Sequence, residues 1–200
     1  MSIKIRLIIM NFLQFAVWGA YLTSMGSYLV NVGLHEHIGM FYAMQGIVSL
    51  FMPAVLGIIA DRWIPAQKLL SFSHFTAALF MAAAGYYGMT KGADVDFGTL
   101  FTLYSLSVAF YMPTLALSNS VAYTALDKAG LDTIRTFPPI RIFGTIGFIC
   151  SMWVVDLLGL QNNYGQFFAC AIIGVAYGVY ALTLPECPTS KGDNAKSLVE

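Results

Sequence analysis

FPPIRIFGTIGFICSMWVV, residues 137–155, is a nearly continuous apolar stretch that contains a single charged residue, Arg141. A run of about 20 apolar residues is long enough to cross the hydrocarbon core of a bilayer as a helix. A charged side chain inside that core costs about 2.5–3.5 kcal/mol on insertion scales, so such residues usually face a polar cavity or a partner. The stretch therefore predicts a membrane-spanning helix, and Arg141 is its first candidate for a functional residue.

The composition of the whole chain favours a membrane protein. Hydrophobic residues make up 58% of the 200 residues and charged residues only 10%, against about 25% charged residues in soluble domains. Six apolar segments are long enough to span a bilayer, and they cover residues 5–31, 39–63, 67–90, 97–125, 137–158 and 164–185. We expect an all-α integral membrane fold, with one six-helix bundle over residues 1–185 and a cytoplasmic linker over residues 186–200.

The basic residues are distributed unequally between the two sides of the predicted bundle. Counting sides by alternation from a cytoplasmic N-terminus, the outer loops contain one basic residue, Lys91. The inner segments contain eight, which are Lys4, Arg6, Arg62, Lys68, Lys128, Arg135, Lys191 and Lys196. Because cytoplasmic loops carry the excess of Lys and Arg, this bias predicts that both termini are cytoplasmic.

The face of the fifth segment that contains Arg141 combines several kinds of side chain. At 100° per residue, Arg141, Thr145, Phe148 and Met152 share one side of the helix. A guanidinium group offers five donors for carbonyl and hydroxyl oxygens, and an aromatic ring offers a stacking surface. The face is suited to an uncharged polar ligand with a flat ring. The alternative is that Arg141 stabilises the bundle by pairing with a carboxylate or with helix-end carbonyls.

Polar and aromatic residues also follow one side of the first and fourth segments. Gln14 and Trp18 belong to such a stripe in the first segment, and Tyr111 belongs to one in the fourth. Amides at membrane depth either join helices to one another or line a cavity, and the pattern leaves both roles open. We therefore regard Gln14, Trp18 and Tyr111 as weaker candidates for ligand contacts.

The sequence lacks the patterns that would indicate an enzyme or a metal protein. It contains no phosphate-binding glycine loop, no cluster of metal ligands and no nucleophile–base arrangement. His35 and His37 belong to a short loop, and the three cysteines have no metal-binding spacing. We expect no catalytic residues, no cofactor, no metal and no nucleic-acid partner.

The segment GIIADRWIPAQK, residues 57–68, lies between the second and third spans. It resembles the loop signature G-x-x-x-D-R/K-x-G-R-R/K of the major facilitator superfamily. Gly57, Asp61 and Arg62 match that signature, whereas Ile64 stands at the position of its second glycine. The resemblance implies that Gly57, Asp61 and Arg62 form a conformational loop, which in the family brackets helix ends and stabilises one state of the transporter.

A closer resemblance extends over nearly the whole chain. Residues 11–19, 51–61, 111–117 and 137–148 are similar to bacterial nucleoside:proton symporters of the same superfamily. Family members have twelve spans in two six-helix halves, and this chain resembles the first half, with its two three-helix repeats. The resemblance implies nucleoside uptake across the bacterial inner membrane, coupled to proton entry, by alternating access. It also implies that Arg141, Thr145 and Phe148 bind the nucleoside, and that the linker leads to a second six-span half.

Two other functions remain open from the sequence. The first is a major facilitator symporter for another polar solute such as a sugar, because aromatic and amide side chains also bind sugars. The second is a membrane scaffold without transport activity, or a six-span half-transporter that works as a dimer. Competition of uptake by nucleosides against hexoses would distinguish a nucleoside symporter from the first alternative. The reading frame after Glu200 would distinguish it from the second.

Overall fold

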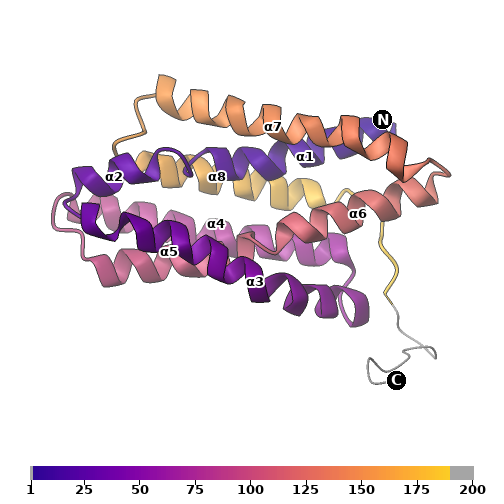
Figure 1. Cartoon of the computed structure of the whole chain (residues 1–200), viewed down its shortest axis with the longest axis horizontal. Coiled ribbons are helices and arrows are strands. Elements are labelled where there is room, and N and C mark those ends of the chain that lie inside the picture. Colours follow the sequence, from indigo (N-terminus) through magenta and orange to yellow (C-terminus); the bar gives the residue numbers. More distant parts are fainter. Residues whose placement is uncertain (1, 190–200) are drawn as a thin grey trace.

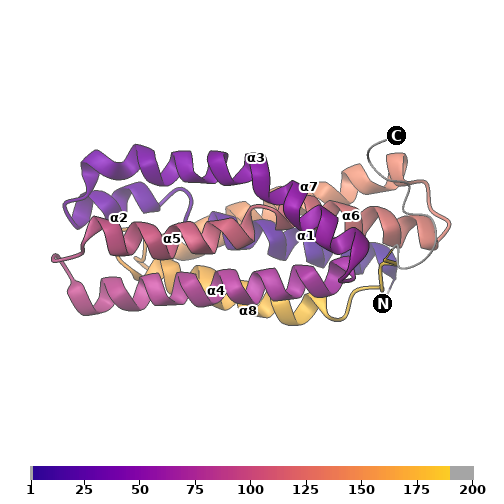
Figure 2. The same cartoon turned by 90° about the horizontal axis from the view of Figure 1, so that it is seen from below.

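The structure, a computed structural model, describes residues 2–189, and all regular secondary structure in that range is helical (Figure 1). Its elements are α1 (Ile3–Gly19), α2 (Met25–Asn31), the 3-10 helix η1 (His35–His37), α3 (Ile38–Arg62), α4 (Ala66–Lys91), α5 (Phe97–Tyr111), α6 (Thr114–Lys128), α7 (Thr133–Leu157) and α8 (Gly165–Ala181). The helices run side by side along the long axis of the molecule (Figures 1 and 2). The expectation of an all-α bundle is confirmed.

Helices occupy each of the six ranges predicted from the sequence, and two of these ranges contain a break. α1 and α2 together fill the first range, and α5 and α6 fill the fourth. By length and composition, four helical stretches are able to cross a membrane, and these are His35–Arg62, Ala66–Lys91, Phe97–Lys128 and Thr133–Leu157. The helix α8 is apolar but shorter. That all six ranges cross the bilayer remains a prediction.

The break between α5 and α6, in the fourth predicted range, has a direct cause in the sequence. Pro113 lacks a backbone N–H, so it cannot donate the helical hydrogen bond to the carbonyl four residues earlier. The helix accordingly ends at Tyr111 and restarts at Thr114. The break between Gly19 and Met25, in the first predicted range, contains no proline that would predict it.

The start of the fifth pass differs from the predicted position. α7 begins at Thr133 rather than at residue 137, because the Asp132 carboxylate caps it by accepting from the backbone amides of Ile134 (2.9 Å) and Arg135 (3.3 Å). Pro138 and Pro139 are therefore not in the first turn of the helix, where proline is common. They lie in the second turn, where their missing N–H groups leave the carbonyls of Ile134 and Arg135 without the usual intrahelical donors.

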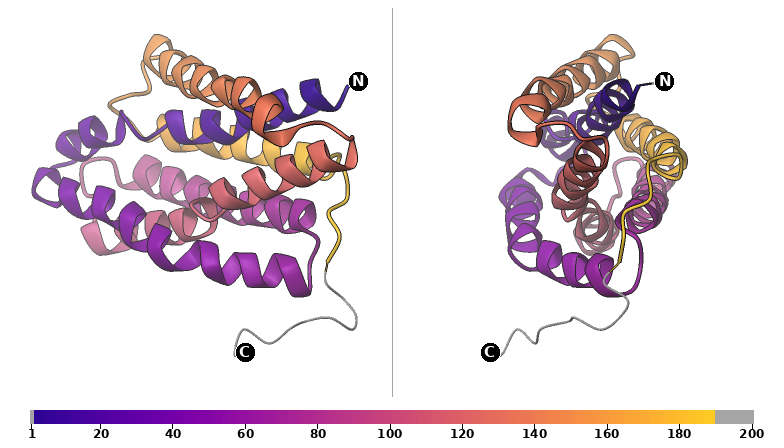
Figure 3. Two further views of the ribbon diagram at one scale, coloured as in Figure 1. Left: turned by 45° about the vertical axis from the view of Figure 1, so that its right-hand side comes forward. Right: turned by 90° about the vertical axis from the view of Figure 1, so that its right-hand side faces the viewer.

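The helix pairs α1–α7 and α4–α8 have the most extensive packing in the bundle. α1 and α7 approach so closely because glycines stand at their contact: a Cβ added at Gly147 would clash with the Phe12 backbone carbonyl, and one at Gly19 with that of Phe148. Figure 2 shows α3 on one side of the bundle and α4 with α8 on the other. The end-on view in Figure 3 shows α7 and α3 at the periphery, where long stretches of their surface are not covered by other helices.

Basic side chains gather at one end of the bundle, as the charge count predicts. The N-terminus, the α3–α4 turn, the α6–α7 turn and the end of α8 all lie there (Figure 1). Lys128 donates to the Glu186 carbonyl at 2.6 Å, and Lys68 lies 4.0 Å from the Glu186 carboxylate. Lys91 is at the opposite end. Lys191 and Lys196 lie outside the described residues, and which end is cytoplasmic remains a prediction.

Candidate functional site

Arg141 lies on the side of α7 that approaches α1. Its guanidinium carbon is 3.9 Å from the centroid of the Phe15 ring, which is a cation–π contact. The ion pairs among residues 2–189 are Lys68–Glu186 and Arg135–Asp132, so no carboxylate in this part of the chain pairs with Arg141. The side chain is only half-buried. The alternative role, a structural lock through a carboxylate, thus has no partner within the described residues.

Arg141 and Thr145 open onto a common groove on the surface of α7. The groove is wide and shallow, and it is also lined by Phe137, Pro138 and Ile142. The Thr145 side chain is exposed one turn beyond Arg141. The groove therefore offers a cation and a hydroxyl group, both accessible from outside this bundle.

Three aromatic rings continue this surface towards the break in the first pass. Phe15, Trp18 and Phe148, here called the aromatic wall, are all half-buried. The Trp18 ring meets the Phe148 ring edge-on, with centroids 6.1 Å apart and planes at 86°. The Phe15 and Trp18 centroids are 6.2 Å apart. The Phe15 ring contacts Arg141, and the neighbouring Trp18 ring contacts Phe148. Two adjacent rings of α1 therefore link these two residues of α7.

Gln14 and Tyr111, two of the weaker candidates, lie in the interior of the bundle rather than on the groove. The Gln14 amide nitrogen donates to the Thr114 hydroxyl at 2.8 Å, and its oxygen is 3.2 Å from Nε2 of His74. Because the amide oxygen can only accept, Nε2 is the protonated nitrogen of His74 in this arrangement. The Tyr111 hydroxyl donates to the Gln14 backbone carbonyl at 2.7 Å. In this structure both side chains join helices to one another.

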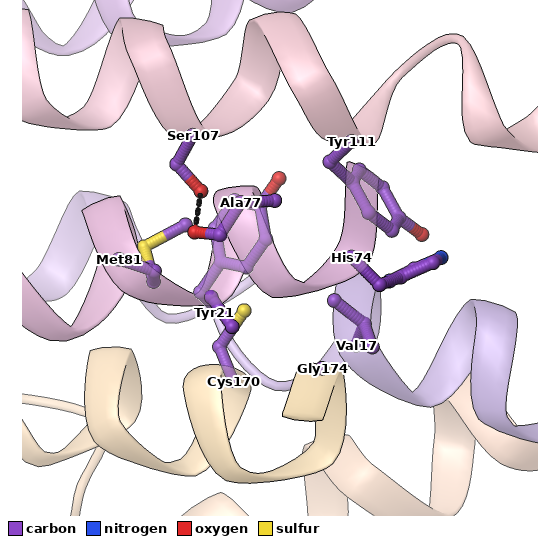
Figure 4. Close-up of a pocket in the computed structure, with 10 residues that line it drawn as sticks. Val17, Tyr21, His74, Ala77, Met81, Ser107, Tyr111, Cys170 and Gly174 are labelled. Carbon is purple, nitrogen blue, oxygen red and sulfur yellow. Dashed lines mark hydrogen bonds between the residues drawn. The ribbon is translucent and has the colours of Figure 1, made fainter. Parts of the chain in front are cut away.

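A small enclosed pocket lies behind these residues (Figure 4). Its lining includes Tyr21, His74, Tyr111 and Cys170. Ser107 also faces it and donates to the Ala77 carbonyl at 2.8 Å, the hydrogen bond drawn in Figure 4. The pocket has room for about one water molecule, and it is too small for a solute with a ring and a sugar.

The residues of the predicted conformational loop lie near the C-terminal end of α3. Asp61 and Arg62 are its last two residues and both are exposed, whereas Gly57 is half-buried one turn earlier. A Cβ added at Gly57 would meet open space within 4 Å. The structure therefore places the three residues in the last two turns of α3, and their role in changing conformation remains a prediction.

The described residues give no sign of a metal centre. Within residues 2–189, no three side chains of His, Cys, Asp or Glu are grouped closely enough to hold a metal ion. His37 instead stacks on Phe97, with ring centroids 4.1 Å apart. Cys150, Cys170 and Cys187 are unpaired thiols.

The sequence reasoning missed two residues that contact this surface. Phe15 holds the guanidinium of Arg141, and Gln45 on α3 accepts a hydrogen bond from the Trp18 indole at 2.8 Å. Gln45 could have been noticed as a lone amide within an apolar helix. Phe15 carries no such signal, because the apolar first segment contains several similar residues.

Comparison with known proteins gives a consistent result. The family model described as "Nucleoside H+ symporter" matches residues 1–199. The chain is 40% identical to the xanthosine permease of Escherichia coli (strain K12) over 203 residues, which cover 99% of this chain and 46% of that protein. It is 40% identical to the nucleoside permease NupG of the same organism over 195 residues, which cover 96% of this chain and 44% of that permease.

The solved structures of nucleoside transporter NupG have the same fold. One superposes with a TM-score of 0.84 at 38% identity, covering 94% of this chain and 45% of that one. A mutant form superposes with a TM-score of 0.89 at 37% identity, covering 98% and 48%. The chain spans about half the length of the curated relatives it matches, and it corresponds to roughly their N-terminal half. Its fold and sequence together show that the chain belongs to the nucleoside H+ symporter family.

Proposed function

We propose that this chain is the N-terminal half of a transporter that moves nucleosides into the cell together with protons, by alternating access. The observation that supports it best is the state of Arg141. Its guanidinium is held over the Phe15 ring at 3.9 Å, it has no ion pair within the described residues, and it opens onto a groove with Thr145. A cation placed in this way remains available to the oxygen atoms of a neutral solute.

The groups on this surface match the chemistry of a nucleoside. Arg141 donates hydrogen bonds to carbonyl or hydroxyl oxygens, and its planar fork can contact two of them at once. Thr145 adds a hydroxyl that either donates or accepts. Phe148, supported edge-on by Trp18, offers an aromatic surface for the base. A solute with both a flat heterocycle and a hydroxylated sugar uses all three kinds of contact.

The remaining candidates act at different distances from the solute. Trp18 belongs to the aromatic wall and contacts the solute beside Phe148. Gln14 and Tyr111 act from behind it, by holding the broken first and fourth passes together. Gly57, Asp61 and Arg62 stabilise one conformation of the transporter at the inner end of α3.

The proposal includes a partner and an orientation in the membrane. A second six-span half of the same protein, joined through the linker at residues 186–200, covers the groove of α7 and completes the site. The bundle over residues 1–185 lies in the bacterial inner membrane, with its basic end and both termini in the cytoplasm. The proton carrier belongs to the second half, because the charged residues of this half lie near the ends of the predicted spans, apart from Arg141.

Uptake of radiolabelled uridine by cells expressing the full-length protein tests this function. We expect uptake above background that falls when a protonophore dissipates the proton gradient, and competition by unlabelled nucleosides but not by hexoses. Absence of uptake, with the protein confirmed in the membrane, would contradict the proposal. Competition by hexoses alone would instead identify a sugar transporter.

A further inference from the structure

We propose that Gln45 is a positioning residue for the candidate site, which fixes the orientation of the Trp18 indole and thereby the aromatic wall. This inference rests on the proposed function, because the wall is where the solute ring is expected to pack. Gln45 lies on α3, outside the groove, and its side chain is buried. It acts on the solute only through Trp18.

The hydrogen bonds of Gln45 allow a single orientation of its amide. The Trp18 indole N–H lies 2.8 Å from the Gln45 amide oxygen, and the Gln45 amide nitrogen lies 2.8 Å from the Tyr104 hydroxyl. An indole nitrogen is a donor only, so the amide must turn its oxygen towards Trp18. The amide nitrogen then donates to Tyr104. The chain Trp18–Gln45–Tyr104 therefore connects α1, α3 and α5 with each group in a defined role.

The indole has a strong reason to keep this geometry. A buried polar group without a partner carries a desolvation penalty, which is paid in full when one side of a hydrogen bond is deleted. Without the Gln45 oxygen, the Trp18 N–H must rotate to find another acceptor or remain unpaired. Rotation changes the edge-on contact at 86° between Trp18 and Phe148, and an unpaired N–H no longer holds the indole in that contact.

The hydrogen bond between Trp18 and Gln45 is not the only one that joins α3 to the segment containing α1 and α2. The Tyr42 hydroxyl, also on α3, donates to the Leu22 backbone carbonyl at 2.7 Å. This second bond joins the same two parts of the bundle but does not touch the aromatic wall. Tyr42 therefore provides a matched control that separates fastening of α3 from positioning of Trp18.

The test uses the full-length transporter and the kinetics of uridine uptake. Gln45→Met removes the amide at similar length, and we expect it to raise KM roughly fivefold, as loss of one hydrogen bond would, with the maximal rate retained. KM is independent of the amount of protein in the membrane, so a lower yield of the variant leaves this readout intact. Trp18→Phe removes the same bond from its other side and is expected to raise KM as well. Tyr42→Phe is expected to leave KM within about twofold of the parent value.

A double variant adds a sharper criterion. If Gln45 acts through Trp18, Gln45→Met together with Trp18→Phe raises KM no further than Trp18→Phe alone, since coupled residues are non-additive. Independent effects of the two substitutions would overturn the inference. An unchanged KM in Gln45→Met, or an equal rise in Tyr42→Phe, would overturn it too.

A second measurement does not depend on which solute is transported. In a background in which Trp63, Trp153 and every tryptophan outside residues 1–200 are replaced by phenylalanine, Trp18 is the remaining tryptophan. We expect Gln45→Met to shift its fluorescence emission and increase its quenching by acrylamide, whereas Tyr42→Phe leaves both unchanged. An unshifted emission would refute the positioning of Trp18. A shifted emission in a protein that takes up no nucleoside would support the positioning and refute the proposed function instead.

Discussion

At the scale of single residues, the surroundings of Arg141 compensate for only part of the cost of a charge at membrane depth. A cation–π contact such as that with Phe15 stabilises by about 0.5–2 kcal/mol, against an insertion cost of about 2.5–3.5 kcal/mol. Gly144 permits the contact, because an added Cβ would lie 2.7 Å from the Phe15 ring and 2.8 Å from Nη1 of Arg141. The remaining cost is consistent with a residue kept for a polar solute rather than for stability.

Arg141→Lys is expected to raise KM for uridine at least tenfold without loss of protein from the membrane. Lysine keeps the charge but lacks the planar fork that contacts two oxygens at once, and hydrogen bonds to charged groups contribute about 1.5–3 kcal/mol. The measurement is uridine uptake at a range of concentrations, with the protein quantified in membranes.

The matched control is Arg135→Lys on the same helix, where the arginine is exposed and pairs with Asp132 at 3.6 Å. It is expected to leave KM unchanged, because surface ion pairs contribute little. A normal KM in Arg141→Lys combined with poor membrane insertion would show that the arginine serves the fold.

At the scale of helices, the bundle is held by buried polar contacts as well as by close packing. Gln14 alone connects α1 with His74 on α4 and with Thr114 at the start of α6. The Tyr111 hydroxyl adds a contact between α5 and the Gln14 carbonyl. These bonds join the two broken passes near their breaks, so the interruptions are stabilised by contacts between helices rather than within them.

Gly147→Ala is expected to destabilise the protein by about 1–3 kcal/mol, because the added methyl group meets the backbone of α1 and forces the two helices apart. A backbone carbonyl cannot rotate away as a flexible side chain would. Thermal unfolding in detergent measures the effect as a lower Tm.

Gly46→Ala on α3 is the control, because an added Cβ there meets nothing within 4 Å. It is expected to leave the Tm unchanged or to raise it slightly, since alanine is the better helix former. Equal Tm values for the two variants would contradict the proposed close packing of α1 on α7.

The start of α5 is expected to lose stability in acid. The Asp96 carboxylate accepts from the Thr99 backbone amide at 2.9 Å and from its hydroxyl at 3.1 Å, and these hydrogen bonds lower the pKa of Asp96. A lowered folded pKa means that the contribution is complete above the unfolded pKa of about 4 and is lost as the pH falls through the folded value.

Asp96→Ala should therefore lower the Tm at pH 7, and the difference from the parent protein should shrink as the pH falls below about 4. Asp94→Ala, two residues earlier in the same exposed turn, is the control and should give a difference that does not follow this pattern. A Tm difference for Asp96→Ala that is the same at pH 7 and pH 3 would contradict the assigned cap.

At the scale of the whole molecule, the two ends of the bundle differ in charge and are expected to face different compartments. In a variant whose native cysteines are replaced by serine, Asp94→Cys should react with a membrane-impermeant maleimide added to intact cells. Trp63→Cys, at the α3–α4 turn at the opposite end, should react only after the cells are permeabilised. The reverse pattern would show that the positive end is outside.

The helical fold was largely predictable, because apolar length and charge distribution are properties of the chain itself. Each of the six predicted ranges contains helix, and the break at Pro113 follows from a missing N–H group. The start of α7 was not predicted correctly, because the sequence contains two signals for a helix start. Asp132 is a capping residue, and the pair Pro138–Pro139 is typical of a first turn; the structure follows Asp132. The break after Gly19 was not predicted at all.

The sequence by itself determined that this is a helical membrane protein of the nucleoside H+ symporter family, and it placed Arg141, Thr145 and Phe148 on one helix face. Helical periodicity and membrane insertion act within one segment, so one segment is enough to reveal them. Only the tertiary structure decided which partners these residues have: Phe15 under the guanidinium, Trp18 against Phe148, and Gln45 from α3 behind the indole. It also placed Gln14 and Tyr111 in the interior, because a contact between helices depends on how two faces turn towards each other.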